Sequence, residues 1–509
     1  MSQNTPNRTP TKVSETGSES SNENRKQEMR VQSARRLRYQ IRIFLLTFFT
    51  YATLHFTRES WSILKPKIQI QDKISSSSLG IMDTAFLSFY SIGLFIGGNL
   101  CDHYNPKYLL IGSYIVVTIV ITIIGLAAEN GYTNTLLFSF LFSINGFMQS
   151  IGWPACAAIF GNWFGKRGRG TLIGLWCSSG NAGNIGGALL TSFLTSTMLY
   201  NWRIAFIIVA SLCTVTAIFD AFFLVVHPQE RGIKIEEYDE ILNETERLLT
   251  VEMARDPTES FLRRQEFDGI QSSKGVNFWQ ALKIPGVMQY SLSYFCLKFS
   301  SYGLLFWLPM FLQKSNNYSD YETAYCVSLL DVGYVLGGVL IGYISDLMYC
   351  RRVPVAVLSI MIATLLHVLL IVSDPSIMWF FLIQILILGT LMGGAVAIVS
   401  GISCTDLGKL KELRSSEKAV ATVTGIIDGI GSFGAAVGQI LIGVFEQYYG
   451  WNSVFIMMSI MVFLGAAPLM KAFHREMKEV ITLFKIHRRR NRAVKNGYRS
   501  LDSDEQINS

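Results

Sequence analysis

The chain is poor in charge and lacks the patterns of several protein classes. Only 16% of its 509 residues are Asp, Glu, Lys or Arg, whereas about 25% of an ordinary soluble domain is charged. Its eight cysteines form no C-x-x-C pair, so neither a disulfide framework nor a zinc site is indicated. Strand-length alternation is missing, which argues against a membrane β-barrel. We therefore expect an α-helical membrane protein without a metal, a cofactor or a nucleic-acid partner.

Apolar residues make up half of the chain and gather in long runs. Runs of about 20 residues are long enough to cross about 30 Å of hydrocarbon as a helix. We predict twelve spans, near residues 40–62, 80–101, 108–128, 134–158, 170–198, 203–226, 286–312, 321–345, 352–373, 377–401, 418–446 and 451–473.

A mostly polar stretch of about 60 residues separates the sixth predicted span from the seventh. It predicts two six-helix bundles, at 40–226 and 286–473, joined by a cytosolic loop at 227–285. Residues 1–39 and 474–509 are predicted to be cytosolic tails, and the polar composition of the first tail predicts disorder. That tail holds no apolar signal peptide, so we expect the first span to direct insertion.

Lys and Arg are unevenly shared between the two sets of loops. One set contains 166–169, Arg351, Arg352 and 409–414, and this basic side is expected to be cytosolic, together with both termini. The other loops hold the less numerous Lys65, Lys67, Lys73, Arg203 and Lys314.

A short motif repeats between the two halves. The sequence G-x-x-x-D ends the second predicted span at 98–102 and the eighth at 342–346. Parallel repeats of six helices are typical of transporters, whose substrate binds near the bilayer midplane between the repeats.

Two cations interrupt the apolar runs. Arg58 lies near the end of the first run and Lys298 in the middle of the seventh. Hydrocarbon cannot solvate either charge, so both residues are candidates for a functional site. Helical spacing places Tyr51 and His55 on the same face as Arg58.

The same spacing places Tyr294, Ser301 and Tyr302 on the face of Lys298. A cation with hydroxyl groups nearby, offered from each half of the chain, suits a phosphate group, since Arg supplies a planar fork of donors and Lys a point charge. The alternative for Arg58 is an ion pair or a side chain that reaches the membrane surface.

Two acidic residues within the spans are candidates for gating or charge balance. Asp83, near the start of the second span, is expected to pair with Arg58 when the site is empty. Asp428, in the eleventh span, is expected to balance Lys298. Proton relay and purely structural ion pairing stay open as alternatives.

Several segments then carry a family resemblance. FTRESWSILK, GNWFGKRGRGTLIGLW, HPQERG and ATVTGIIDGIGSFGAAVGQ resemble the sugar-phosphate exchanger branch of the organophosphate:phosphate antiporters, within the major facilitator superfamily. The resemblance covers nearly all of residues 40–475 and implies the major facilitator fold. It also implies a non-enzymatic function: a sugar phosphate, of the glucose-6-phosphate or glycerol-3-phosphate type, exchanged for inorganic phosphate by alternating access.

The resemblance also implies roles for particular residues. Arg58 falls on the first-span arginine of the family, and Ser301 falls on the seventh-span arginine of its bacterial members. Lys298, one turn earlier, stands in for that arginine. The remaining implied pocket positions are Tyr51, His55 and Tyr90.

The chain departs from the family pattern at three places. Glu59 stands where many members have a basic residue, Leu94 replaces a bacterial lysine, and Ser179 or Gly180 replaces a histidine. Two other functions therefore stay open. One is a proton- or sodium-coupled carrier of another organic anion, in which Asp83 or Asp428 titrates, and the other is a non-transporting sensor or partner subunit.

The resemblance implies an endoplasmic reticulum location. Residues 244–249 and 498–501 are similar to endolysosomal sorting signals, which leaves a lysosomal or endosomal membrane as the alternative. We expect a monomer, with an accessory subunit as a further partner beyond the lipid bilayer and the phosphate-bearing substrates.

Overall fold

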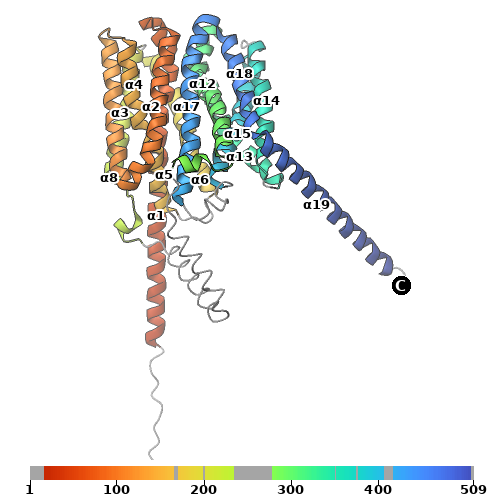
Figure 1. The fold of residues 1–509 in the computed structure, drawn as a ribbon. Helices are drawn as coiled ribbons and strands as arrows, with labels where there is room; N and C mark the ends of the chain where they lie inside the picture. Colours follow the sequence, from red (N-terminus) through yellow and green to blue (C-terminus); the bar gives the residue numbers. More distant parts are fainter. Residues whose placement is uncertain are drawn as a thin grey trace, which may run out of the picture.

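A computed structural model describes residues 16–164, 170–198, 201–233, 278–349, 351–373, 377–405 and 417–505. Over these residues the chain is helical and contains no strand (Figure 1). The first half contains α1 (Thr16–Asp72), α2 (Ser76–His103), α3 (Pro106–Glu129), α4 (Thr135–Ser150), α5 (Gly152–Trp163), α6 (Gly170–Cys177), α7 (Ser179–Phe193), η1 (Leu194–Met198), α8 (Trp202–Phe223) and η2 (Pro228–Arg231). The second contains α11 (Phe278–Leu282), α12 (Val287–Asn316), α13 (Asp320–Leu347), α14 (Val353–Val372), α15 (Met378–Thr405), α17 (Glu417–Tyr449), α18 (Trp451–Ala466), η4 (Ala467–Leu469) and α19 (Met470–Glu505).

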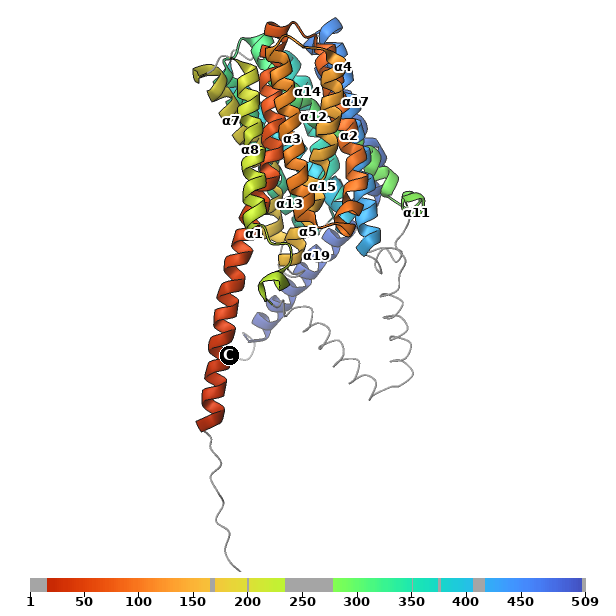
Figure 2. The same ribbon diagram turned by 90° about the vertical axis from the view of Figure 1, so that its left-hand side faces the viewer.

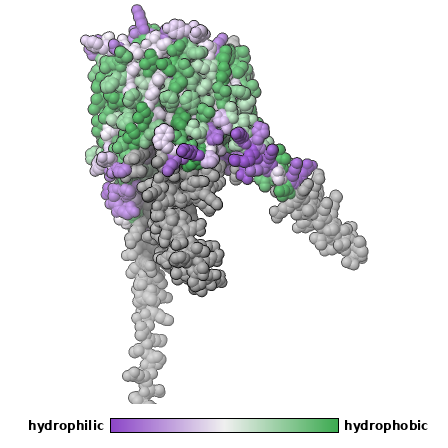
Figure 3. Space-filling model, viewed as in Figure 1, coloured by the Kyte–Doolittle hydropathy of each residue, from purple (hydrophilic) through white to green (hydrophobic). Residues whose placement is uncertain are grey.

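Ten helical segments of the described chain are long and apolar enough to cross a membrane. Figure 3 shows the corresponding hydrophobic belt around the helices, with hydrophilic residues at its two ends. The two other predicted spans fall on α1, which also carries a long polar extension, and on α6 and α7, which are 8 and 15 residues long. The count of twelve spans therefore stays a prediction for these two segments.

The helix contacts of the first half have counterparts in the second. In the first half α1 packs on α7, α2 on α4 and α3 on α8; in the second α12 packs on α17, α13 on α15 and α14 on α18. The halves meet where α2 packs on α17, α7 on α13 and α1 on α12 (Figures 1 and 2). The cross-half contacts obey the same symmetry, because α2 and α7 correspond in the second half to α13 and α17.

Glycine lets α2 and α17 approach closely. A Cβ atom at Gly80 would lie 2.7 Å from the Gln439 carbonyl oxygen, and one at Gly443 would lie 2.6 Å from the Ser76 carbonyl oxygen. Either side chain would force the two helices apart, so this contact between the halves depends on both glycines.

The structure differs from the sequence prediction at the start of α1 and within the fifth span, and the fourth span, predicted at 134–158, also divides at Ile151 between α4 and α5. Residues 16–39, predicted to be disordered, form the beginning of α1. No Gly or Pro occurs between residues 18 and 65, so the helix extends without interruption into the first span. The fifth span, predicted to be continuous, breaks at Ser178 between α6 and α7, where the sequence Ser-Ser-Gly has low helix propensity.

The beginning of α1 and the end of α19 lie on one side of the helix assembly, which we name the terminal face, and the other side is the opposite face (Figure 1). The two ends of the described chain thus share a face, as the distribution of basic residues predicts. The basic loops at 166–169 and 409–414, the loop at 234–277 and the candidate sorting signal at 244–249 lie outside the described residues.

Candidate functional site

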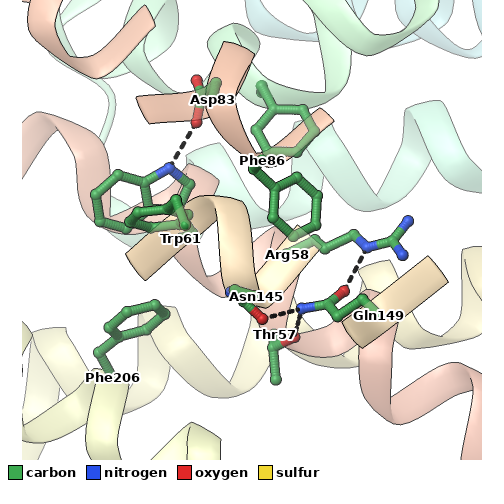
Figure 4. Close-up of a pocket in the computed structure, with 10 residues that line it drawn as sticks. Thr57, Arg58, Trp61, Asp83, Phe86, Asn145, Gln149 and Phe206 are labelled. Carbon is green, nitrogen blue, oxygen red and sulfur yellow. Dashed lines mark hydrogen bonds between the residues drawn. The ribbon is translucent and has the colours of Figure 1, made fainter. Parts of the chain in front are cut away.

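Arg58 of α1 is buried, with 3% of its surface exposed. Its Nε donates to Gln149 Oε1 of α4 at 2.7 Å (Figure 4). Its guanidinium carbon lies 4.5 Å from the ring centre of Tyr90 and 5.5 Å from that of Phe86. Its two terminal nitrogens have no hydrogen-bond partner among the described residues. Arg58 therefore offers a positive charge and two unused donor nitrogens.

Gln149 fixes the direction of Arg58. Its amide nitrogen donates to Asn145 Oδ1 at 3.0 Å and to Thr57 Oγ1 at 3.2 Å, so the oxygen that accepts from Arg58 cannot turn away (Figure 4). A small cavity beside Arg58 and Asn145 has a volume of about 10 Å³, room for about one water molecule.

Lys298 of α12 is paired, in contrast to Arg58. Its Nζ donates to Asp428 Oδ1 at 2.6 Å and to Ser432 Oγ at 3.0 Å, both on α17. The ammonium lies 4.7 Å from the ring centre of Tyr294 and 5.8 Å from that of Tyr302. The expected contact between Asp428 and Lys298 is present, and it neutralises the lysine.

The two cations face a common group of polar side chains. Arg58 and Lys298 both interact electrostatically with Tyr302 and with His55. Tyr51 lies in the same electrostatic neighbourhood, because it interacts with Arg58, Tyr90 and Tyr302. Because α1 and α12 belong to different halves and pack on each other, the cations approach one region from both sides.

His55 and Ser301 contribute unused polar atoms. His55 Nδ1 lies 3.1 Å from Asn184 Oδ1, whereas its Nε2 and the Ser301 hydroxyl have no partner in the described part of the chain. The His55 and Tyr51 rings are 4.9 Å apart. A Cβ atom at Gly180 would lie 3.2 Å from the His55 ring, so the small residue at this departure from the family pattern leaves room for an imidazole offered by α1.

Asp83 does not pair with Arg58, contrary to the expectation from the sequence. It forms an ion pair with Lys65 and accepts a hydrogen bond from Trp61 Nε1 at 2.8 Å. The sequence placed Lys65 in a loop, but α1 continues to Asp72 and carries Lys65 into the protein interior, where it is completely buried. Lys65 Nζ also donates to the Phe306 carbonyl oxygen of α12 at 3.0 Å, so this pair joins the two halves.

A second ion pair joins the halves nearer the opposite face. Lys67 Nζ of α1 lies 2.6 Å from Asp320 Oδ2 at the start of α13, and the Thr195 and Ser196 hydroxyls donate to the same oxygen at 3.0 Å. The Ser62 hydroxyl donates to the Leu305 carbonyl oxygen at 2.7 Å. We refer to the cross-half contacts of Ser62, Lys65 and Lys67 as the opposite-face lock.

Two carboxylates that the sequence did not assign to the site are buried in the structure. Glu59 is completely buried, and neither carboxylate oxygen has a hydrogen-bond partner among the described residues. Asp331 of α13 is also buried; Asn181 and Asn184 of α7 each donate to its Oδ1 at 2.9 Å, and its Oδ2 is unpartnered in the described chain. The sequence signal for Glu59 was its replacement of a basic residue.

Comparisons with known proteins agree with this architecture. Residues 43–416 match the family model of the Major Facilitator Superfamily. The chain is 35% identical to Sugar phosphate exchanger 3 of Bos taurus over 84% of this chain and 92% of that protein. It is 30% identical to the Glucose-6-phosphate exchanger SLC37A2 of Bos taurus over 86% of this chain and 94% of that protein.

A solved structure shows the same fold at low sequence identity. The structure of a bacterial homologue of the human lysosomal transporter Spinster superposes with a TM-score of 0.58 at 14% identity, covering 88% of this chain and 98% of that one. The expected fold and the expected family are thereby confirmed. The chain belongs to the major facilitator superfamily and, within it, to the family of the sugar-phosphate exchangers.

Proposed function

We propose that this multi-pass membrane protein is a secondary active transporter, not an enzyme, and exchanges a sugar phosphate for inorganic phosphate by alternating access. The observation that carries the proposal is Arg58, a buried arginine with two unused nitrogens beside a group of tyrosine hydroxyls. An arginine fork of this kind matches the oxygens of a phosphate group. The names of the relatives support the same class of substrate.

Arg58 is the primary contact for phosphate in this proposal. Lys298 uses two of its three ammonium donors on Asp428 and Ser432, so it contributes to phosphate binding through its remaining donor or by releasing Asp428. Tyr51, His55, Tyr90, Ser301 and Tyr302 supply the surrounding polar contacts.

Charge couples binding to closure. Closing the halves on the terminal face as well would seal Arg58, already only 3% exposed, from the water of both faces, and an unpaired charge in a low-dielectric interior costs several kcal/mol. Bound phosphate offsets this cost by neutralising the guanidinium. The empty carrier therefore closes slowly, and exchange is faster than net transport in one direction.

Asp83 and Asp428 have separate roles. Asp83 stabilises the opposite-face lock through Lys65, and the protein must break this contact to open on that face. Asp428 balances the charge of Lys298 when no phosphate is bound. Neither carboxylate is free in this conformation, as a simple proton relay through them would require.

We also propose that the protein is a monomer of the endoplasmic reticulum membrane with the terminal face toward the cytosol. In this proposal residues 40–226 and 286–473 move as two bundles connected by 227–285. Microscopy of a tagged chain together with markers of the endoplasmic reticulum and the lysosome tests the location.

Reconstituted vesicles test the function. Purified protein in phosphate-loaded proteoliposomes should take up labelled glucose-6-phosphate, and uptake should require internal phosphate and be unaffected by a protonophore. Uptake that persists without internal phosphate and collapses with the protonophore would identify a proton-coupled carrier. Binding of phosphate without any flux would identify a sensor.

A further inference from the structure

Glu59 is an anomaly in the electrostatics of the protein. The other buried acidic groups at the interface of the halves have donors: Asp83 has Lys65 and Trp61, and Asp331 has two asparagine amides. Glu59 is 0% exposed and has no donor in the described part of the chain. Burying an ionised carboxylate without a partner costs several kcal/mol, and such a group takes up a proton instead.

The groups around Glu59 favour this protonated form. Asp331, a second carboxylate, interacts with it electrostatically from the other half and opposes a negative charge, whereas Lys65 favours one. Lys65 is already neutralised by its own ion pair with Asp83. The two asparagine donors on Asp331 stabilise its ionised form, whereas Glu59 has no donor in the described chain, so Glu59 is the carboxyl more readily protonated.

The helices packed on α1 bring no further free charge to Glu59. The α7 segment Ser179–Phe193, which covers it at Gly187, contains no titratable side chain, and a Cβ atom at Gly187 would lie 3.1 Å from the Glu59 Cβ. Arg58, the neighbour in sequence, is directed to Gln149 and Tyr90. The other titratable side chains on the packed helices have their own contacts or are neutral. Asp220 of α8 accepts a hydrogen bond from Thr50, Lys298 of α12 is paired with Asp428 of α17, and Cys156 of α5 is a buried thiol.

The position of Glu59 along α1 decides which membrane face can reach it. Ser60, the next residue, shares a hydrogen bond of 2.7 Å with Thr191 of α7. Ser62, Lys65 and Lys67, which form the opposite-face lock, follow within about two turns toward the opposite face. Opening that lock separates α1 from α12 and α13 directly beyond Glu59, and water then enters from the opposite face.

We propose that Glu59 is a proton-binding site that communicates only with the opposite face, and that the opposite-face lock closes only when Glu59 carries a proton. This inference rests on the proposed exchange function. The proton returns to the face from which it came when the lock reopens, so no net proton crosses the membrane and exchange stays insensitive to a protonophore.

The proposal predicts a one-sided pH dependence. A hydrated glutamate titrates near pH 4.3, and above this the protonated fraction falls about tenfold for each pH unit. Where closure of the lock limits the cycle, the exchange rate falls by up to the same factor as the pH of the opposite face rises. The pH of the terminal face has no such effect, because Glu59 is sealed in the conformation with the lock closed.

The experiment measures exchange of labelled for unlabelled inorganic phosphate in proteoliposomes, with the pH of each side set separately. A protease-cleavable tag after α19 reports the orientation of the protein in each preparation. Glu59→Gln, which imitates the protonated form, should lose the dependence on Glu59 and keep only the pH effect of the phosphate's own titration. The titration of phosphate itself affects wild type and variant alike, so the difference between their profiles isolates Glu59.

Two further variants complete the experiment. Asp220→Asn is the matched control, because it removes a buried carboxylate of α8 that accepts hydrogen bonds from Thr50 of α1. This variant should keep the wild-type pH profile. Glu59→Asp should keep the one-sided dependence if Glu59→Gln fails to fold. Exchange that responds equally to both faces, or an identical profile in wild type and Glu59→Gln, would overturn the proton site alone. Absence of any phosphate exchange in wild type would instead overturn the proposed function.

Discussion

The two halves present the same helices but opposite electrostatic solutions for a buried cation. In the first half, Arg58 contacts the neutral Gln149 and two aromatic rings and keeps two nitrogens unused. In the second half, Lys298 is held by the carboxylate of Asp428. The symmetry of the fold is therefore not a symmetry of charge: the first half keeps its cation available for an anion, and the second stores its cation in an ion pair.

This difference has a consequence for how phosphate draws the halves together. The exposed fraction of the Asp428 side chain is 34%, against 8% for Lys298, so the carboxylate can swing toward water while the ammonium stays in place. Phosphate that binds first at Arg58 can then compete with Asp428 for Lys298. The second half thus binds phosphate only after the first half has bound it.

Removal of the unpaired cation should have the largest effect. Arg58→Ala should reduce phosphate exchange by roughly a hundredfold or more, because charge-assisted hydrogen bonds contribute about 1.5–3 kcal/mol each. Arg58→Lys keeps the charge but loses the planar fork, and should recover only part of the rate. Exchange in proteoliposomes, with thermal unfolding in detergent as a folding control, measures both. Near-normal exchange by Arg58→Ala would show that the first half does not bind the phosphate.

Removal of the carboxylate that pairs with Lys298 should increase the affinity for phosphate. Asp428→Asn frees Lys298, so phosphate should bind up to about tenfold more tightly, the value of one charge-assisted contact. The same variant should lower the melting temperature, because the nearly buried ammonium loses its partner. Isothermal calorimetry with inorganic phosphate compares it with wild type. Weaker binding would mean that Asp428 itself takes part in holding the cargo.

Substitution of the two lysines of the opposite-face lock should have smaller effects, and the effects should differ between the two lysines. Lys65→Met removes a completely buried ion pair, whereas Lys67→Met removes one in which 20% and 13% of the two side chains are exposed. Opening of the opposite face should therefore increase strongly in Lys65→Met and only a fewfold in Lys67→Met, since partly exposed pairs contribute about 1 kcal/mol or less.

Labelling of a cysteine introduced in place of Leu64 measures this opening. Leu64, directly before Lys65 on α1, is completely buried, so a membrane-impermeant thiol reagent added at the opposite face should reach it only when the lock opens. The parent chain without this cysteine supplies the background. Equal labelling in wild type and both variants would show that these ion pairs do not keep the face closed.

The sequence predicts the fold well because membrane helices are long and their apolar runs are unambiguous. It misses the break at Ser178, where local helix propensity rather than hydropathy decides. Arg58 and Lys298 are identifiable because a charge in an apolar run is costly. The partner of Asp83 was wrong because the end of α1 was placed too early, which put Lys65 outside the membrane.

Other features depend on contacts that no local pattern records. Lys67 and Asp320 are separated by 253 residues and meet only after the halves pack together. Glu59 is notable for the absence of partners in the described structure, and a sequence cannot show that a side chain lacks a donor. The substrate-binding roles of Tyr51, His55, Tyr90, Ser301 and Tyr302 stay predictions until variants are measured.

A double-mutant cycle between Arg58 and Lys298 tests the central claim, that one phosphate contacts cations of both halves. Phosphate affinity is measured by calorimetry for wild type, Arg58→Gln, Lys298→Met and the double variant. A shared ligand predicts that the two losses are not additive, with a coupling free energy of about 1 kcal/mol or more. Losses that add to within about 0.3–0.5 kcal/mol would mean that the cations act at separate places, and the exchange mechanism described above would be wrong.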